Sequence, residues 1–263
     1  MPSYAIVGAS RGIGLEYVRQ LAGRPDTVVF PIVRNSVSST YLQSFVSENT
    51  NVHILEADVG DAANALSEIT GGSLDCLIHN AARVDPDAVF KGYDAYETVA
   101  EMDDDLIVSF KINALGFIHA VKAFLPLIRA ASSGGKTIVS INSAGAAPNF
   151  IRGVGIGHMV GYGMSKAALL VATTKWAVDL APEHFTVVSL SPGLVDISET
   201  AGDSEEASKF VREEGEKYVQ AGFPDMGAQT VEQSVAAQLK VIDGLSVEDT
   251  GKFFAHTGNE FQM

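Results

Sequence analysis

Apolar residues along this chain form short runs that alternate with longer segments of helical periodicity. The short runs predict seven strands, at residues 4–7, 27–33, 52–56, 74–79, 137–141, 186–190 and 252–255. The longer segments predict helices at residues 12–22, 61–69, 104–131 and 162–180. Alternation of this kind predicts βαβ crossovers, and therefore an α/β fold whose parallel sheet has helices on both faces.

No linker, composition shift or internal repeat divides the chain, so we predict a single domain over residues 1–263. Asp61 is expected to cap the helix that begins there. Residues 196–226 break the alternation, because they are rich in acidic residues yet carry Phe210 and Tyr218 at helical spacing. This segment is interpreted either as a solvated surface helix or as a lid whose apolar face closes over a substrate.

Composition and charge exclude several classes of protein. The formal net charge is -14, which argues against a nucleic-acid partner, because a phosphate backbone requires a basic surface. No basic segment followed by a long apolar one opens the chain, and no stretch approaches the roughly 20 apolar residues that span a bilayer. We therefore expect a cytoplasmic protein with no membrane partner. Its single cysteine, Cys76, lies in an apolar run and is expected to be a small core residue.

Three glycines directly follow the first predicted strand and open the first predicted helix. Gly8, Gly12 and Gly14 lie in the segment GASRGIG. In this position glycines allow the backbone to approach a pyrophosphate, which the N-terminus of the helix then holds electrostatically. The loop therefore predicts a dinucleotide-binding site.

Arginines near this loop suggest which dinucleotide binds. Arg34 follows the second predicted strand, where an NAD site usually carries an acidic residue that binds the ribose 2′-hydroxyl. A carboxylate would repel a 2′-phosphate, whereas a guanidinium can pair with it in a fork. Arg11 adds a second cation within the glycine loop. We predict NADPH as the cofactor; the alternative is that both are ordinary surface arginines.

The segment GYGMSK offers a candidate for proton transfer. Tyr162 and Lys166 lie four residues apart, and hence one turn apart on one face of a helix. An ammonium near a phenol favours the phenolate, and would lower the Tyr162 pKa from its usual value of about 10. Tyr162 could then act as a general acid or base at neutral pH, while Ser143 held the oxygen of a carbonyl substrate. Alone, the spacing is a weak signal, because an ordinary helix can carry a half-buried Tyr and a solvated Lys.

Taken together, these motifs resemble those of the short-chain dehydrogenase/reductase family over essentially the whole chain. The matching positions are Gly8, Gly12, Gly14, Asp58, Val59, Asn80, Ala81, Ala82, Asn113, Ser143, Tyr162, Lys166, Pro192 and Gly193. The stretch 231–254 is similar to the carbonyl-reductase branch that includes C-factor and sniffer proteins. Some ketoreductases of aromatic polyketide pathways also resemble this branch.

The resemblance implies a single-domain Rossmann fold with a doubly wound, parallel, seven-stranded sheet, and it implies roles for individual residues. Tyr162 would donate a proton to the carbonyl oxygen as hydride arrives from the nicotinamide. Lys166 would lower the Tyr162 pKa and bind the nicotinamide ribose, Ser143 would polarise the carbonyl, and Asn113 would support a water chain. Asp58 would meet the adenine edge. The implied cofactor contacts are Gly8, Ser10, Arg11, Gly12, Ile13, Gly14, Arg34, Asp58, Val59, Asn80, Ala81, Tyr162, Lys166, Pro192, Gly193 and Val195; no metal is implied.

Three features depart from the family pattern. His79 replaces an Asn, and is expected to pack in the core rather than to catalyse. Ile197 stands where many members have a Thr that touches the nicotinamide carboxamide, which leaves that contact to the backbone. The segment 144–161 is longer than in most members. It is expected to line the substrate pocket, or alternatively to be a mobile surface loop.

The sequence thus predicts NADPH-dependent reduction of a ketone or aldehyde, with a bulky apolar or aromatic small-molecule substrate such as a secondary-metabolite ketone. One alternative is a redox-neutral dehydratase, isomerase or cyclase on the same fold, and another is a non-catalytic NADPH sensor. The complete set of Asn113, Ser143, Tyr162 and Lys166 argues against both. In this family the helices corresponding to 104–131 and 162–180 commonly pair between subunits, which suggests a homodimer or homotetramer; alternatively, they only pack on the sheet.

Overall fold

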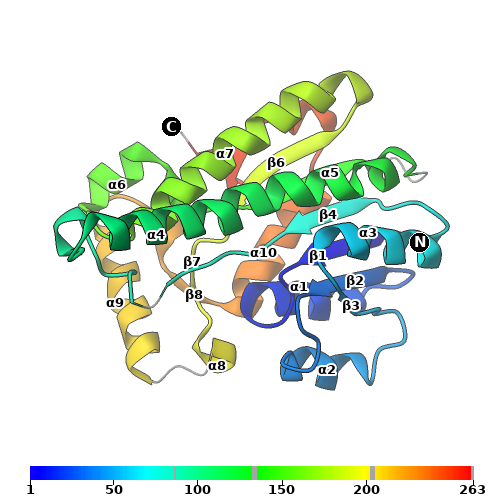
Figure 1. Cartoon of the computed structure of the whole chain (residues 1–263), viewed down its shortest axis with the longest axis horizontal. Coiled ribbons are helices and arrows are strands. Elements are labelled where there is room, and N and C mark those ends of the chain that lie inside the picture. Colours follow the sequence, from blue (N-terminus) through cyan, green and yellow to red (C-terminus); the bar gives the residue numbers. More distant parts are fainter. Residues whose placement is uncertain (86, 132–134, 202–204, 262–263) are drawn as a thin grey trace.

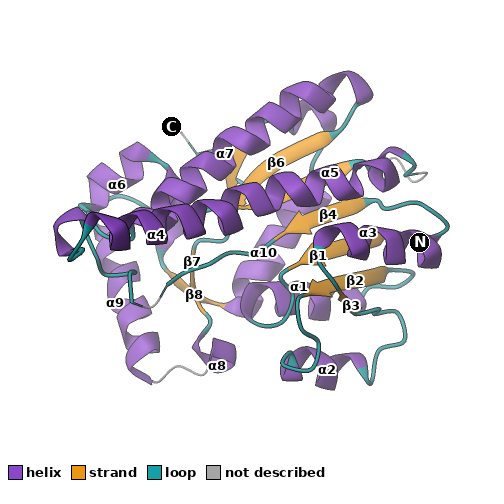
Figure 2. Cartoon of the chain, in the orientation of Figure 1, coloured by secondary structure: helices purple, strands orange, loops and turns teal. Residues whose placement is uncertain are grey.

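Seven parallel strands form the central layer of the protein in a computed structural model that describes residues 1–85, 87–131, 135–201 and 205–261 (Figures 1 and 2). The strands run in the order β3-β2-β1-β4-β5-β6-β9. Their bounds are β1 Ser3–Val7, β2 Val28–Val33, β3 Leu55–Glu56, β4 Cys76–His79, β5 Thr137–Ile141, β6 Thr186–Ser191 and β9 Phe253–Ala255. Every pairing in this sheet is parallel. The predicted Rossmann fold is confirmed, with the strand order reversing between β1 and β4, where such folds bind ligands.

Helices cover both faces of the sheet. Their bounds are α1 Gly12–Ala22, α2 Thr40–Val46, α3 Val59–Thr70, α4 Val99–Phe110, α5 Gly116–Arg129, α6 Pro148–Val154, α7 Val160–Leu180, α8 Ser198–Ala201, α9 Glu205–Gln220 and α10 Val231–Asp243. One apolar cluster joins Ala5 and Val7 of β1 to α3, α5 and α7. A second joins Ile6 of β1 to α1, α2 and α10. Side chains alternate across a strand, so consecutive apolar residues of β1 fill both cores.

The predicted helix at 104–131 is longer than expected and is interrupted. It begins at Val99, where the side chain of Thr98 accepts a hydrogen bond from Glu101 N–H at 3.1 Å. A π-helical turn, Lys111–Leu115, separates α4 from α5. The run 99–129 is long and apolar enough to cross a membrane by length and composition, so the expectation that no such stretch exists was wrong. In this structure α5 contributes buried residues, among them Phe117, Phe124 and Ile128, to the core on one face of the sheet.

Several local predictions are corrected. Asp58, not Asp61, caps α3: its carboxylate accepts from Gly60 N–H and Asp61 N–H at 2.9 and 3.3 Å. The third strand is only two residues long, and Val52 forms an isolated bridge with Val29. The segment 144–161 is not a plain loop, because it contains a 3₁₀ turn, Ala144–Ala146, and helix α6.

A second, two-stranded sheet was not predicted. It pairs β7, Leu194–Asp196, with β8, Ala228–Thr230, in parallel. The predicted lid, 196–226, lies between these strands and contains α8 and α9; its residues 202–204 lie outside the described residues. The small sheet thus fastens both ends of the lid beside the turn that follows β6.

Candidate active site

The glycine loop is packed so tightly that larger residues would not fit. A Cβ on Gly8 would lie 2.6 Å from the Cα of Ala81, and one on Gly14 would lie 2.7 Å from the side-chain nitrogen of Asn80. That nitrogen donates to the Gly8 carbonyl at 2.9 Å. Gly8 and Gly12 also adopt positive φ angles of 84° and 55°, which favour glycine. The loop is therefore held by the end of β4 and leaves the start of α1 facing the cleft.

The two predicted phosphate-binding arginines, Arg11 and Arg34, are both exposed and line the same cleft. Neither forms an ion pair within the described residues. Ser36 donates from its backbone and its hydroxyl to the Glu56 carboxylate, and these bonds lower the Glu56 pKa. Glu56 thus orders the loop that carries Arg34, a role that the sequence did not indicate.

The candidate catalytic side chains converge from β5 and α7. Ser143 and Tyr162 line the same cleft, and the Ser143 side chain is close enough to lower the pKa of the Tyr162 phenol. Lys166, only 2% exposed, donates from Nζ to the Ile141 carbonyl at 2.7 Å, and its Nζ lies 5.6 Å from the centroid of the Tyr162 ring. Ser143 and Tyr162 are nineteen residues apart in the sequence. They come together because the end of β5 and the start of α7 meet at the carboxyl edge of the sheet.

The expected lowering of the Tyr162 pKa is contradicted. Burial raises this pKa above 10.0, and the hydrogen bond from Ser143 only partly opposes that effect. Burial also lowers the Lys166 pKa from 10.5 to about 7. A lysine with that pKa is only partly charged at neutral pH, and its nitrogen is engaged by the Ile141 carbonyl. Both facts weaken its pull on the phenol.

Asn113 is fully buried in the π-helical turn, and its side chain is fully engaged. Its amide oxygen accepts from Arg83 N–H at 2.6 Å, and its amide nitrogen donates to the Arg83 carbonyl and the Ser165 hydroxyl at 3.1 and 2.8 Å. Ser165 in turn donates to the Tyr162 carbonyl at 2.7 Å. Asn113 therefore ties the segment after β4 to the helix turn that carries Tyr162.

His79 behaves as a packing residue in most respects. It is 2% exposed and stacks edge-on against Phe117, with ring centroids 5.5 Å apart. Burial and the positive charge of Lys166 lower the His79 pKa to about 3, so the ring is neutral at physiological pH. Its Nδ1 has no hydrogen-bond partner within the described part of the chain.

One cleft of about 1800 Å³ collects nearly all of the predicted site residues. Every predicted catalytic or cofactor-contacting residue lines it except Gly14, which packs beneath the glycine loop, and Asn113, which lies behind Tyr162. The 144–161 segment contributes several apolar residues to its wall, and the lid contributes Tyr218 and Met226. The prediction that both segments border the substrate pocket is consistent with this lining.

The apolar wall joins α6 to the lid. The Phe150 ring packs edge-on against Tyr218 and Phe223, at centroid distances of 5.3 and 4.9 Å. Met226 belongs to the same buried cluster. Farther out, Phe210 of the lid contacts Phe90 edge-on at 5.3 Å. The lid is thus docked on the wall through aromatic contacts and is not a solvated surface helix alone.

The lid also reaches the glycine loop, through contacts that no sequence signal indicated. The Thr200 hydroxyl accepts from Gly12 N–H at 2.9 Å, and Ile197 Cγ2 lies 3.4 Å from the position of a Cβ on Gly12. Ile197 therefore faces the glycine loop with a side chain that cannot hydrogen-bond.

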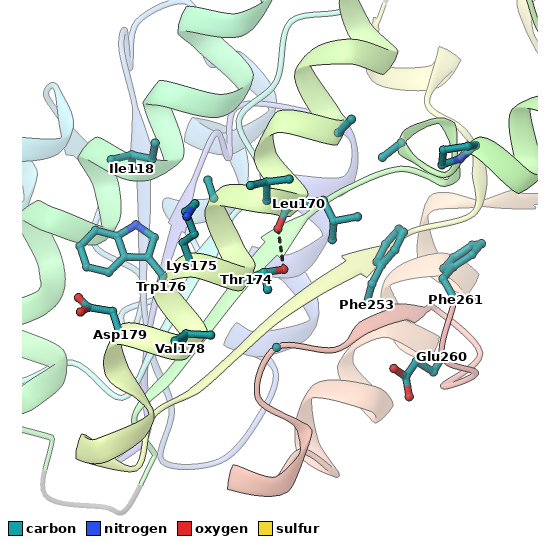
Figure 3. Close-up of a pocket in the computed structure, with 16 residues that line it drawn as sticks. Ile118, Leu170, Thr174, Lys175, Trp176, Val178, Asp179, Phe253, Glu260 and Phe261 are labelled. Carbon is teal, nitrogen blue, oxygen red and sulfur yellow. Dashed lines mark hydrogen bonds between the residues drawn. The ribbon is translucent and has the colours of Figure 1, made fainter. Parts of the chain in front are cut away.

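A second cavity, of about 1090 Å³, lies away from this chemistry (Figure 3). It is an apolar groove along α7, with Leu170, Thr174 and Val178 on one side and Phe253 and Phe261 on the other. None of the predicted site residues lines it.

Comparison with known proteins places these features in one family. The model of the short chain dehydrogenase family matches residues 3–209. The short-chain dehydrogenase/reductase atnB of Arthrinium sp is 36% identical over 273 residues, covering 98% of each chain. The short-chain dehydrogenase/reductase AacuF of Aspergillus aculeatus is 35% identical over 269 residues, covering 99% of each.

Two solved structures are similar over their full length. An NADPH-bound carbonyl reductase from chicken fatty liver has a TM-score of 0.80 and 25% identity, and the match covers 100% of this chain and 99% of the other. The carbonyl reductase Sniffer of D. melanogaster has a TM-score of 0.78 and 27% identity, covering 100% of both chains. Fold, cleft and relatives together define an oxidoreductase. The chain belongs to the short-chain dehydrogenase family, and its resemblance to the sniffer branch is confirmed.

Proposed function

We propose that this protein reduces the carbonyl group of a ketone or aldehyde with NADPH. The observation that carries the proposal is the convergence of Ser143, Tyr162 and Lys166 in the cleft that the glycine loop also lines. A non-catalytic sensor would not need this set. The glycine loop, where a Cβ on Gly8 or Gly14 would collide with neighbouring atoms, and the arginines at the rim fit a phosphorylated dinucleotide.

In the proposed reaction, NADPH supplies the hydride when it is bound. The hydroxyls of Ser143 and Tyr162, which line the same cleft, hold the carbonyl oxygen of the substrate. The high pKa of Tyr162 keeps its proton in place until the oxygen becomes basic, and Tyr162 then donates it. Lys166, with a pKa of about 7, stabilises the resulting phenolate and can replace the lost proton. Asn113 holds the turn that carries Tyr162.

The choice of NADPH over NADH rests on Arg11 and Arg34. Both are exposed at the rim of the cleft and free of ion pairs within the described residues, so both can pair with a 2′-phosphate. The similar carbonyl reductase from chicken fatty liver is described as NADPH-bound, which supports the same choice here. Glu56, at the end of the neighbouring strand β3, accepts hydrogen bonds from Ser36.

The cleft wall supports a bulky, apolar or aromatic substrate. Phe150, Ile151, Ile156 and Met226 line it beside Tyr162, and they offer dispersion contacts and ring faces but few polar groups. A secondary-metabolite ketone is one candidate of this kind.

We further propose a homodimer or homotetramer formed through α7, and a cytoplasmic location. Val171 and Val178 of α7 are 56% and 72% exposed, and both line the apolar groove, where Figure 3 labels Val178. The one cysteine, Cys76, is free and buried, which suits a reducing compartment. Sedimentation of Val178→Lys tests the first point: this variant should dissociate, whereas Val37→Lys, at an exposed valine between β2 and α2, should not. A monomeric wild-type protein would exclude the proposed pairing.

The first test of function measures NADPH consumption by the purified protein against aromatic ketones, quinones and aldehydes, with NADH run alongside. We expect consumption that requires both a carbonyl compound and the Tyr162 hydroxyl. Tight NADPH binding without consumption of any carbonyl compound would favour the redox-neutral or sensor alternatives. Faster consumption of NADH than of NADPH would contradict the assignment of Arg11 and Arg34.

A further inference from the structure

The turn between β6 and β7, which carries Pro192 and Gly193, packs against side chains to which the sequence analysis assigned no role. Gly193 has a positive φ of 79°, and a Cβ there would overlap the side-chain nitrogen of Gln229 and lie 2.8 Å from Nδ1 of His256. Glycine is therefore required at this position by two packed side chains as well as by backbone conformation.

The Pro192 carbonyl accepts two hydrogen bonds from those supporting elements. Gln229 Nε2 donates to it at 2.9 Å, and the Ser234 hydroxyl donates at 2.8 Å. A carbonyl can only accept, so the Gln229 atom that faces it must be the amide nitrogen. The same nitrogen lies 3.2 Å from His256 Nε2, which must then be an acceptor. Burial lowers the His256 pKa, which favours the neutral ring, and this tautomer leaves the proton on Nδ1 without a hydrogen-bond partner within the described residues.

Gln229 also holds the other end of this segment. In the small parallel sheet its backbone lies opposite Val195. One residue therefore fastens the segment 192–195 twice, through its side chain at Pro192 and through its backbone at Val195.

A buried chain of hydrogen bonds extends from Ser234 to the helix that follows the glycine loop. Gln238 Nε2 donates to the Ser234 hydroxyl at 2.9 Å, and the Tyr17 hydroxyl donates to Gln238 Oε1 at 2.7 Å. Tyr17, Ser234 and Gln238 are each completely buried. The Tyr17 and Ser234 hydroxyls and one N–H of Gln238 each meet an acceptor, so this chain links the Pro192 carbonyl to α1.

We infer that Gln229 and Ser234 are positioning residues for the nicotinamide end of the cofactor. Their hydrogen bonds fix the orientation of the Pro192 carbonyl. They thereby fix the position of the backbone of residues 192–195, which borders the cleft. The Ile197 side chain cannot hydrogen-bond the cofactor, which leaves polar contacts of this segment to its backbone, and the bonds from Gln229 and Ser234 preorganise that backbone. The inference rests on the proposed function, because it requires NADPH in the cleft.

The test compares the binding of the whole cofactor with the binding of its adenosine half alone. Calorimetric titrations compare NADPH with adenosine 2′,5′-bisphosphate, which has the adenine, the ribose and the 2′-phosphate but no nicotinamide. Gln229→Met removes the amide donor at similar size, Ser234→Ala removes the hydroxyl, and the double variant removes both. We expect the double variant to bind NADPH about tenfold more weakly, since two hydrogen bonds are lost, while its affinity for the bisphosphate changes less than about twofold.

Tyr17→Phe is the matched control, because it breaks the same buried chain two bonds away from Pro192. It should lower thermal stability without changing the ratio of the two affinities. Equal weakening of both ligands in the double variant, or no weakening of either, would overturn the inference. If the double variant does not fold, Gln229→Met, at a half-buried position, gives the same comparison, with a loss of severalfold expected. A wild-type protein that binds neither ligand would instead refute the proposed function.

Discussion

Replacing Lys166 with methionine should abolish carbonyl reduction while stabilising the nucleotide-free protein at neutral pH. Lys166 is 2% exposed, and burial lowers its pKa from 10.5 to about 7. Each pKa unit corresponds to about 1.4 kcal/mol, so the buried lysine costs the fold up to about 5 kcal/mol at pH 7. Methionine avoids this cost but leaves the Ile141 carbonyl without its donor, a loss of about 1–3 kcal/mol.

The sign of the pH dependence follows from proton binding. Between pH 7 and 10.5 the unfolded chain keeps a proton on Lys166 and the folded protein does not. The stability of the wild-type protein relative to Lys166→Met therefore rises with pH, by up to about 4 kcal/mol between pH 7 and 10. Buried groups away from Lys166, such as Cys76, are affected alike in both proteins and cancel in the difference.

The assay is urea unfolding at pH 7, 8, 9 and 10, followed by the fluorescence of Trp176. Lys122→Met, at an exposed position of α5, controls for the loss of a lysine. A difference between wild type and Lys166→Met that is the same at all four pH values would refute the argument, because it would show that Lys166 is equally charged in both states.

Three further predictions test other parts of the site. Tyr162→Phe should abolish turnover and leave NADPH binding nearly intact by calorimetry; normal turnover would contradict the proton-transfer role. Arg34→Asp should weaken NADPH far more than NADH in the same titrations, and equal losses would exclude a 2′-phosphate contact. Phe150→Ala should destabilise the protein by about 3–5 kcal/mol, because it empties a buried site between Tyr218 and Phe223. It should also raise KM for bulky ketones; an unchanged melting temperature and KM would show that α6 does not form the wall.

The sheet was predictable because its strands are buried on both faces. Such strands appear in a sequence as continuous apolar runs, and all seven were found. The small sheet of β7 and β8 was not predicted, because its strands are three residues long and half exposed, with no apolar run to mark them. The start of the interrupted helix was missed because Val99 is exposed and its cap, Thr98, follows an irregular segment.

The candidate site was predictable where local chemistry requires a particular residue. The glycine loop needs residues without a Cβ, and proton transfer needs a phenol with a nearby amine. The electrostatics were not predictable in the same way. Spacing alone placed Lys166 near Tyr162, but the depth of burial decided that the Lys166 pKa falls and the Tyr162 pKa rises.

The sequence by itself determined the seven strands of the main sheet, four of the helices, the family, and which residues carry the candidate chemistry, because those properties depend on residue type and short-range spacing. Only the tertiary structure decided how these residues are supported. Gly12 meets Thr200 from 188 positions away, and Pro192 meets Gln229 from 37 positions away. Contacts of this kind depend on how the lid and the small sheet pack against the main sheet. Hydrogen-bond partners that lie far apart in the sequence cannot be identified from residue type and spacing, because only this packing brings the donors and acceptors together.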